Sequence, residues 1–420
     1  MTRPRVLIVA PFPPSRVGAH GGSRAVAHLV TGLVADAAVA VAYLRGPEEG
    51  PLEPGLRVMC EAALELERRG PAGTRLARLG RRLRLTIGLL RGRPMWVTDY
   101  APTRRSLRQL EQLISEWRPN ILQLEYPLMA AYLRDVGQHV RVLTDHDPEH
   151  EAADQRALGA SGLSRLVLSL DARAWRRQLS RAAAHVHAIV AFTEEDRQSL
   201  RSIAPQARIE VIPLTVPLPA EALDPVGHGM TLLFIGNFAH PPNRDAAIWL
   251  GRDILPLIRH RIPSVRLELV GDDPAGELQR LFVHDPAIVV SGWVPDVHDM
   301  LDRSAVIVAP IRFGGGMRVK VMEALAAGKA VVTTPLGAAG LSAATTRQLL
   351  LAQDAREVAD ATVRLLEDPA LRRDLGRRAR AWAEANSSPT SRSARYLGLY
   401  GELTTPASGD APRGIEGNGA

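Results

Sequence analysis

The stretch RFGGGMRVKVMEALAAGKAVVTTPLGAAGL, residues 312–341, decides the fold of this chain. The apolar run before it, 304–310, predicts a buried parallel strand, and the run 330–333 within it predicts the next strand. A helix is expected between them, from Met317 to Ala327. Three glycines open that helix: Gly314, Gly315 and Gly316. Strand, glycine-rich turn, helix and strand together make one βαβ unit.

The glycine-rich turn has the chemistry of a phosphate site. Backbone N–H groups and the positive end of the helix favour an anion there. Arg318 and Lys320 add cations in the first helical turn, beside Met317. Glu323 follows Lys320 by three residues, on about the same helix face. The turn is therefore predicted to hold a nucleotide diphosphate together with its hydroxyl-bearing ribose.

Length and composition indicate a two-domain globular protein. A chain of 420 residues exceeds one ordinary core, and 46% hydrophobic with 23% charged residues is typical of globular proteins. The single cysteine, Cys60, excludes an internal disulfide framework and fits a reducing compartment. No apolar run reaches the ~18 residues of a membrane span, and Pro11 cuts short the first one. We therefore expect a cytoplasmic protein.

The charge pattern leaves two interpretations open. The net charge is +7, but with 4% aromatic residues base stacking is not supported, so no nucleic-acid partner is expected. Basic residues concentrate at 68–93, where arginines alternate with leucines. This is a basic amphipathic helix, able to lie on the inner face of an anionic membrane or bind an anionic acceptor. The alternative is a solvated helix that packs on its own domain.

Both halves of the chain alternate apolar runs with helical patterns, as doubly wound α/β domains do. In the first half we expect strands at 6–10, 39–43, 121–124, 140–144, 188–191 and near 208–212, and helices at 23–33, 103–117 and 164–181. In the second half we expect strands at 231–235, 266–270, 288–290, 306–309 and 331–333, and helices at 245–261, 296–302, 318–327, 355–367 and 369–385.

Domain boundaries follow from these patterns. We expect a first domain at 1–211, a proline-rich linker at 212–228 and a second domain at 229–386. A last helix, 391–402, has an apolar stripe with nothing to cover in the second domain, so it is expected to pack back on the first. Residues 404–420 are polar and rich in glycine and proline, and are expected to be disordered.

Ligands bind at the carboxyl ends of parallel strands, and polar candidates follow several of the expected strands. Gly21 and Gly22 allow close backbone approach after the first strand, although an ordinary flexible connection has the same composition. His146 and Asp147 follow the strand 140–144 as candidate catalytic groups. A solvated turn, or a metal site made of Asp145 and Asp147, are the alternatives there.

Two further sites follow strands. Glu125 and Tyr126 come after 121–124 and are expected to face the cleft as acceptor contacts. Gly236 suits a tight turn near a ligand after 231–235. Asn243 is a polar candidate in the same loop, and it also fits the cap of the next helix.

The order of these motifs resembles a known family. Gly236-Asn-Phe, Val270-Gly-Asp, Gly292-Trp-Val-Pro-Asp and the segment 310–324 are similar to group-one glycosyltransferases of the GT-B fold. The resemblance implies two Rossmann-like domains facing across a cleft, with the nucleotide-sugar donor on the second and the acceptor on the first. It also implies retention of configuration, and neither a metal nor a cofactor besides the nucleotide-diphosphate sugar.

The resemblance implies residue roles as well. Glu323 matches the glutamate that holds the donor ribose, whereas Gly315 stands where the family has a first glutamate. Arg318 and Lys320 are expected to replace, against the diphosphate, a basic pair that this chain lacks. His146 loosely matches a histidine near the donor sugar.

We therefore expect a glycosyltransferase of the hexosyltransferase type (EC 2.4), acting on a glycan, lipid-linked or small-molecule acceptor. One alternative is a sugar-nucleotide epimerase-like enzyme of the same fold. The other, suggested by Gly315, is a nucleotide-sugar-binding protein whose catalytic ability has decayed. Incubation with nucleotide sugars and acceptors separates the three hypotheses. Sugar transfer supports the transferase, an isomerised donor supports the epimerase-like enzyme, and binding without turnover supports the binding protein.

Overall fold

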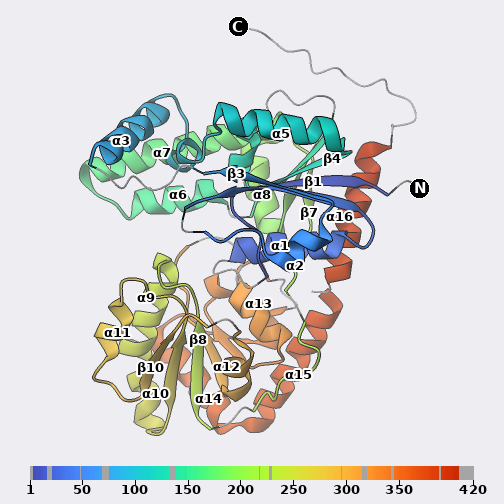
Figure 1. Cartoon of the computed structure of the whole chain (residues 1–420). Coiled ribbons are helices and arrows are strands. Elements are labelled where there is room, and N and C mark those ends of the chain that lie inside the picture. Colours follow the sequence, from blue (N-terminus) through green and yellow to red (C-terminus); the bar gives the residue numbers. More distant parts are fainter. Residues whose placement is uncertain are drawn as a thin grey trace.

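The computed structural model has two α/β domains, one above the other in Figure 1. It describes residues 3–16, 21–47, 49–68, 75–132, 139–146, 148–216, 218–226, 229–294, 296–314, 319–341, 345–386 and 389–405. Within these ranges no helix is long and apolar enough to cross a membrane.

The first domain is built on a seven-stranded sheet in which every neighbouring pair is parallel. Its spatial order is β3-β2-β1-β4-β5-β6-β7. The strands are β1 (Arg5–Ala10), β2 (Ala38–Arg45), β3 (Ala62–Glu67), β4 (Ile121–Glu125), β5 (Val140–Thr144), β6 (Ala188–Ala191) and β7 (Ile209–Val211). The central strands are buried along their length, which explains their continuous apolar runs. The edge strand β3 was not predicted.

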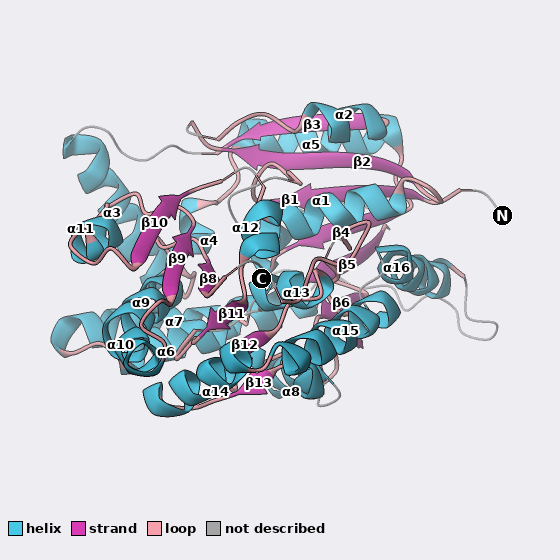
Figure 2. Cartoon of the chain, turned by 90° about the horizontal axis from the view of Figure 1, so that it is seen from below, coloured by secondary structure: helices cyan, strands magenta, loops and turns pink. Residues whose placement is uncertain are grey.

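The second domain repeats this architecture with a six-stranded parallel sheet in the order β10-β9-β8-β11-β12-β13. The strands are β8 (Thr231–Ile235), β9 (Arg266–Val270), β10 (Ile288–Gly292), β11 (Val306–Ala309), β12 (Val331–Thr333) and β13 (Leu350–Leu351). Figure 2 shows them in this order, with α9 (Pro241–Trp249) and α10 (Leu255–Arg261) on one side and α12 (His298–Arg303) and α13 (Val319–Ala326) on the other.

The remaining helices surround the two sheets. In the first domain they are α1 (Gly21–Leu33), α2 (Pro54–Met59), α3 (Arg75–Leu90), α4 (Met95–Asp99), α5 (Arg104–Trp117), α6 (Glu149–Leu158), α7 (Gly162–Ala183) and α8 (Glu194–Ile203). In the second they are α11 (Glu277–Phe282), α14 (Ala355–Glu367) and α15 (Pro369–Asn386), and the last helix is α16 (Pro389–Thr404).

The predicted helix 245–261 is present, begins earlier, at Pro241, and contains a π-helical turn. It consists of α9, the π-helical turn (Leu250–Ile254) and α10 without a gap. Pro256 explains the π-helical turn, because proline has no N–H to donate and its ring clashes with the preceding turn.

The last helix, α16, packs on the first domain. Tyr396, Leu399 and Tyr400 belong to the first domain's core, and α16 contacts α1. The Tyr400 hydroxyl donates to Gln123 Oε1 at 2.8 Å, and the Tyr396 hydroxyl lies 3.0 Å from Thr144 Oγ1. Both tyrosines are therefore joined to polar groups at the centre of the sheet.

A first prediction concerns Tyr400→Phe. The substitution leaves Gln123 Oε1 buried without this donor, so we expect the first domain to lose about 1–3 kcal/mol of unfolding free energy, measured by urea denaturation. The matched control is Ser202→Ala, which removes an exposed hydroxyl of the same domain and is expected to stay within about 0.5 kcal/mol of wild type. An equal effect of both variants contradicts the importance of this contact.

A second prediction concerns His28 on α1. Burial, together with the cations Arg392, Arg24 and Arg16, lowers the pKa of His28 to about 4. The unfolded chain takes up this proton below pH ~6.5, whereas the folded chain resists it until about pH 4. With respect to His28, the free energy of unfolding is therefore highest above pH 6.5. It falls by on the order of 3 kcal/mol as the pH is lowered toward 4.

His28→Gln is expected to flatten this part of the acid dependence, measured as unfolding free energy at neutral pH and near pH 4.5. His298→Gln changes an exposed histidine and serves as control. If the two variants keep the same acid dependence as wild type, His28 is not a source of it.

Candidate active site between the two domains

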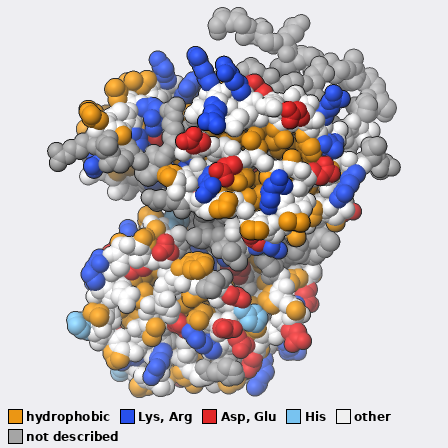
Figure 3. Space-filling view, in the orientation of Figure 1, with side chains coloured by type: hydrophobic (Ala, Val, Ile, Leu, Met, Phe, Trp, Pro, Cys, Tyr) orange, Lys and Arg blue, Asp and Glu red, His pale blue; other side chains and the backbone are white. Residues whose placement is uncertain are grey.

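The candidate residues gather where each sheet reverses its strand order. The first sheet reverses between β1 and β4 and the second between β8 and β11. Loops at the carboxyl ends of such strands form the usual ligand crevice of doubly wound domains. In Figure 3 the surface is indented between the two domains.

Three contacts join these loops across the domains. Arg24 Nη1 of α1 lies 3.2 Å from Glu323 Oε1 of α13. The Gly314 N–H donates to Gln155 Oε1 of α6 at 3.3 Å. A Cβ placed on Gly21 would lie 3.3 Å from a methyl group of Val319. The start of α1 therefore faces the start of α13.

In the second domain, Lys320 and Asn243 are brought together. Lys320 Nζ donates to Asn243 Oδ1, and it lies 5.4 Å from the centre of the Phe234 ring. Asn243 Nδ2 donates to the carbonyl of Asn237 at 2.9 Å. Asn243 is not the helix cap, because α9 already begins at Pro241 with His240 at the cap position. Its amide instead orients the lysine ammonium.

Two glycines of this loop pair have little room beside them. A Cβ on Gly236 would lie 3.1 Å from the Asn243 amide carbon. Gly314 has φ +97°, and a Cβ there would lie 2.6 Å from Pro242. A side chain at Gly314 would therefore both strain the backbone and clash. Close backbone packing holds the loops after β8 and β11 together.

Glu323 lies largely buried at the domain junction, with 15% of its side chain exposed. Burial raises the pKa of its carboxyl above the ordinary value, while the nearby Arg24 and Lys320 cations oppose that shift. Arg24 was not predicted as a site residue. Only its place in the first turn of the helix after the glycine-rich loop pointed to the cleft.

In the first domain, Tyr126 and His146 form a stacked pair. Their ring centres lie 4.2 Å apart with an angle of 6° between the planes, and Phe192 meets the histidine edge-on at 5.1 Å. Tyr126 has φ +75°, a strained conformation that recurs at functional sites. A Cβ on Gly22 would lie 2.0 Å from the Tyr126 hydroxyl, so this position requires glycine.

A buried carboxylate fixes the orientation of His146. His146 Nε2 donates to Glu125 Oε2, and Gln123 Nε2 donates to Glu125 Oε1 at 2.9 Å. Gln123 Nε2 also lies 2.8 Å from Thr144 Oγ1. Glu125 is 0% exposed, so the expectation that its carboxylate faces the cleft is wrong for this structure. The signal for this pairing, polar residues at the ends of two neighbouring strands, was present in the sequence but was interpreted as acceptor contact.

Five predicted site residues lie outside the described residues: Asp147, Gly315, Gly316, Met317 and Arg318. Their roles stay predictions. Within the described ranges no group of three or more His, Cys, Asp or Glu side chains is arranged to hold a metal ion.

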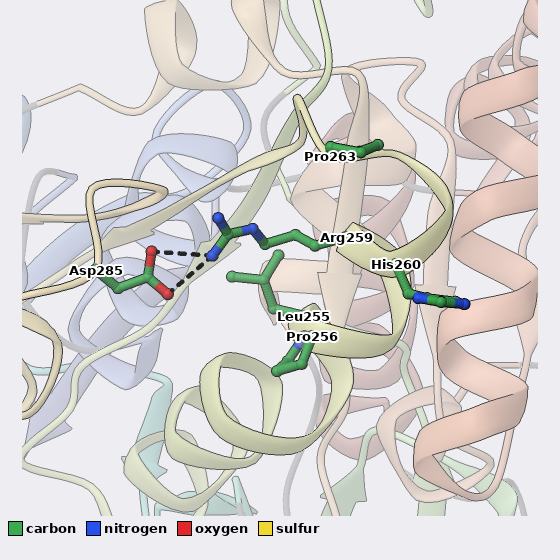
Figure 4. A pocket seen from close by; sticks show the side chains of 6 residues that line it. All are labelled: Leu255, Pro256, Arg259, His260, Pro263 and Asp285. Atoms are coloured by element: carbon green, nitrogen blue, oxygen red, sulfur yellow. Dashed lines mark hydrogen bonds and ion pairs between the residues drawn. The ribbon is translucent and has the colours of Figure 1, made fainter.

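A separate hollow of about 400 Å³ lies in the second domain, lined by α10 and the segment before β10. Figure 4 shows Arg259 reaching across it to Asp285, at 3.2 Å from both carboxylate oxygens. None of the candidate site residues lines it.

Comparison with known proteins relates the second domain to one family. Residues 229–368 match the model of the family described as "Glycosyl transferases group 1". An uncharacterized 44.6 kDa protein of the cps region of Klebsiella pneumoniae is 25% identical over 134 residues, which cover 30% of this chain and 34% of that protein. This chain thus matches about a third of that relative's length.

Solved structures extend the likeness of fold to most of the chain. HepE of Anabaena, solved with UDP and glucose, has a TM-score of 0.64 at 13% identity, covering 95% of this chain and 100% of that one. TarM of S. aureus was solved as a mutant in a complex that includes UDP. It has a TM-score of 0.55 at 14% identity, covering 70% of this chain and 59% of that one. The chain therefore has the GT-B fold, and its second domain matches the group 1 glycosyl transferases.

Proposed function

We propose that the protein is a group 1 glycosyltransferase that moves a sugar from a nucleotide-diphosphate sugar to an acceptor. The observation that carries the proposal is the meeting of Lys320, Asn243 and Glu323 at the start of α13, opposite the start of α1. An ammonium for phosphate and a carboxylate for hydroxyls lie on one helix face. The second domain's family match supports the same activity.

The second domain is the proposed donor site. Lys320, with Arg318 and the backbone of Gly314, Gly315, Gly316 and Met317, binds the diphosphate. Glu323 accepts hydrogen bonds from the ribose hydroxyls, for which it exchanges its contact with Arg24. Gly236 and Asn243 shape the floor of this site, and Gly21 and Gly22 let the first domain approach the donor.

The chemistry needs stabilisation of a leaving group. Breaking the bond between sugar and diphosphate leaves negative charge on phosphate and an oxocarbenium-like sugar. Lys320 and the helix N–H groups stabilise that charge at the time it develops. Retention of configuration and independence from a divalent metal are part of this proposal and rest on the family resemblance.

The first domain is the proposed acceptor side. His146, which is 6% exposed, is proposed to contact the transferred sugar with Asp147 beside it, and Tyr126, which is 5% exposed and stacked on His146, is proposed to border the acceptor path. Glu125 acts through His146, because the buried carboxylate contacts the imidazole rather than solvent. The acceptor is a glycan, a lipid-linked sugar or a small molecule, and the active protein is proposed to reside in the cytoplasm.

A third prediction tests the donor site. A thermal-shift screen with UDP-, GDP- and dTDP-sugars identifies the donor, which raises the melting temperature by mass action. Lys320→Ala and Arg318→Ala each remove a charge-assisted contact to the diphosphate. We expect kcat/KM for the donor to fall by about 10- to 100-fold, corresponding to ~1.5–3 kcal/mol.

The control for this test is Arg377→Ala, which removes an exposed arginine on α15, outside the site. It is expected to keep wild-type kinetics. Unchanged donor kinetics in both Lys320→Ala and Arg318→Ala sink the assignment of the diphosphate site. If a nucleotide sugar binds but its sugar is never transferred, the protein is instead a nucleotide-sugar-binding protein that has lost its catalytic ability.

A fourth prediction separates Glu125 from the donor-binding residues. Glu125→Gln keeps the side-chain shape but removes the charge that holds His146, so kcat is expected to fall about tenfold or more with donor KM unchanged. Glu151→Gln, an exposed carboxylate beside His150, is the control and should leave both constants unchanged. A rise in KM at constant kcat contradicts a positioning role for Glu125.

A further inference from the structure

Helix α3 presents a stripe of large apolar side chains to solvent. Their exposed fractions are Leu76 83%, Leu79 64%, Leu83 61%, Ile87 39% and Leu90 78%. At ~100° per residue these five positions fall within an arc of about 80°. We call them the leucine stripe. Single exposed leucines are ordinary, but five in one row on one helix mark an interaction surface.

The opposite face of α3 holds the helix on the first domain. Gly88 is buried, and a Cβ there would lie 2.4 Å from Thr98 Oγ1 of α4. Arg81 and Arg84 pair with Asp99 at the end of the same helix. The helix is thus anchored through one side, while the leucine stripe points away from the anchor.

Positive charge flanks the leucine stripe on both sides. Residues 68–98 contain no Asp or Glu. In the helical projection Arg82 lies beside one edge of the stripe and Arg91 beside the other. Among the described residues neither has a carboxylate partner. Figure 3 shows hydrophobic and basic side chains gathered at the end of the first domain where Figure 1 places α3.

We propose that the leucine stripe docks on an anionic lipid bilayer, with α3 lying in the plane of the membrane surface. Apolar side chains on one face and arginines along both edges are the arrangement that enters the interface and pairs with lipid phosphates. This inference concerns where the protein works and does not depend on its catalytic activity.

A second copy of the chain is a poorer occupant. Pairing two leucine stripes would bring the rows of arginines from two α3 helices together, and 68–98 supplies no carboxylate to neutralise them. A bilayer supplies both the apolar depth and the negative charge. The neighbouring helix α7, which contacts α3, adds exposed Leu163 and Leu166 near its start.

The test is co-sedimentation of the full chain with vesicles. Vesicles of phosphatidylcholine with phosphatidylglycerol are expected to bind the protein, and phosphatidylcholine alone to bind it far less. Binding is measured at low and at high salt. The double variant Leu79→Gln with Leu83→Gln should weaken binding by about tenfold or more at both salt concentrations. Arg82→Gln with Arg91→Gln should weaken it by about tenfold at low salt and less at high salt.

Matched controls come from the second domain. Leu257→Gln with Val283→Gln changes two exposed apolar residues, and Arg377→Gln with Arg378→Gln changes two exposed arginines. Both are expected to bind as wild type, and all variants should keep the wild-type melting temperature. Equal binding to neutral and anionic vesicles, no binding, or binding insensitive to the leucine variants overturns the proposal. So does a dimer in light scattering that the leucine variants abolish, because the occupant is then a second copy.

Discussion

The buried carboxylate of Glu125 is the constraint on which the first domain depends. A charge at 0% exposure is costly unless it is paired and hydrogen-bonded. His146 and Gln123 supply those partners, and Gln123 in turn needs a donor for its own oxygen, which Tyr400 provides. The polar chain therefore begins at the candidate catalytic histidine and ends on the last helix. The C-terminal helix is tied to the site although Tyr400 follows His146 by 254 positions in the sequence.

Polar contacts also join the two domains at their junction. The Arg24–Glu323 ion pair leaves 27% and 15% of the two side chains exposed, and the Gly314–Gln155 hydrogen bond is exposed to solvent. Such contacts can exchange for ligand contacts without unfolding either domain, as hinge closure requires. In the proposed donor site, a ribose hydroxyl would compete with Arg24 for Glu323, which would link donor binding to the spacing of the domains. Each domain has its own hydrophobic core, so the contacts between the domains can change while both domains stay folded.

The sequence was sufficient for features that one strand or turn determines. Buried parallel strands produce continuous apolar runs, so β1, β8 and β11 could be located, and the glycine-rich turn announced α13. The edge strand β3 has a mixed pattern, because it is partly exposed. The contact of Asn243 with Lys320, 77 residues away, is not visible in the local sequence, which left a ligand contact and a helix cap both open. Glu125 was assigned to the cleft because sequence cannot distinguish a carboxylate facing a ligand from one facing a histidine.

Helix α3 exposes the deepest limit of pattern reasoning. A leucine every three or four residues predicts an apolar face, and on most helices that face is the one that packs inward. Here Gly88 makes the inward contact and Leu85 and Leu89 are half-buried, whereas the leucine stripe is left on the outer side. The periodicity of the sequence predicts an apolar face on the helix. Whether that face points inward or to solvent depends on the tertiary contacts of the opposite face. The arginines at its edges then decide what it can meet, because their charge repels another copy of itself and attracts an anionic surface.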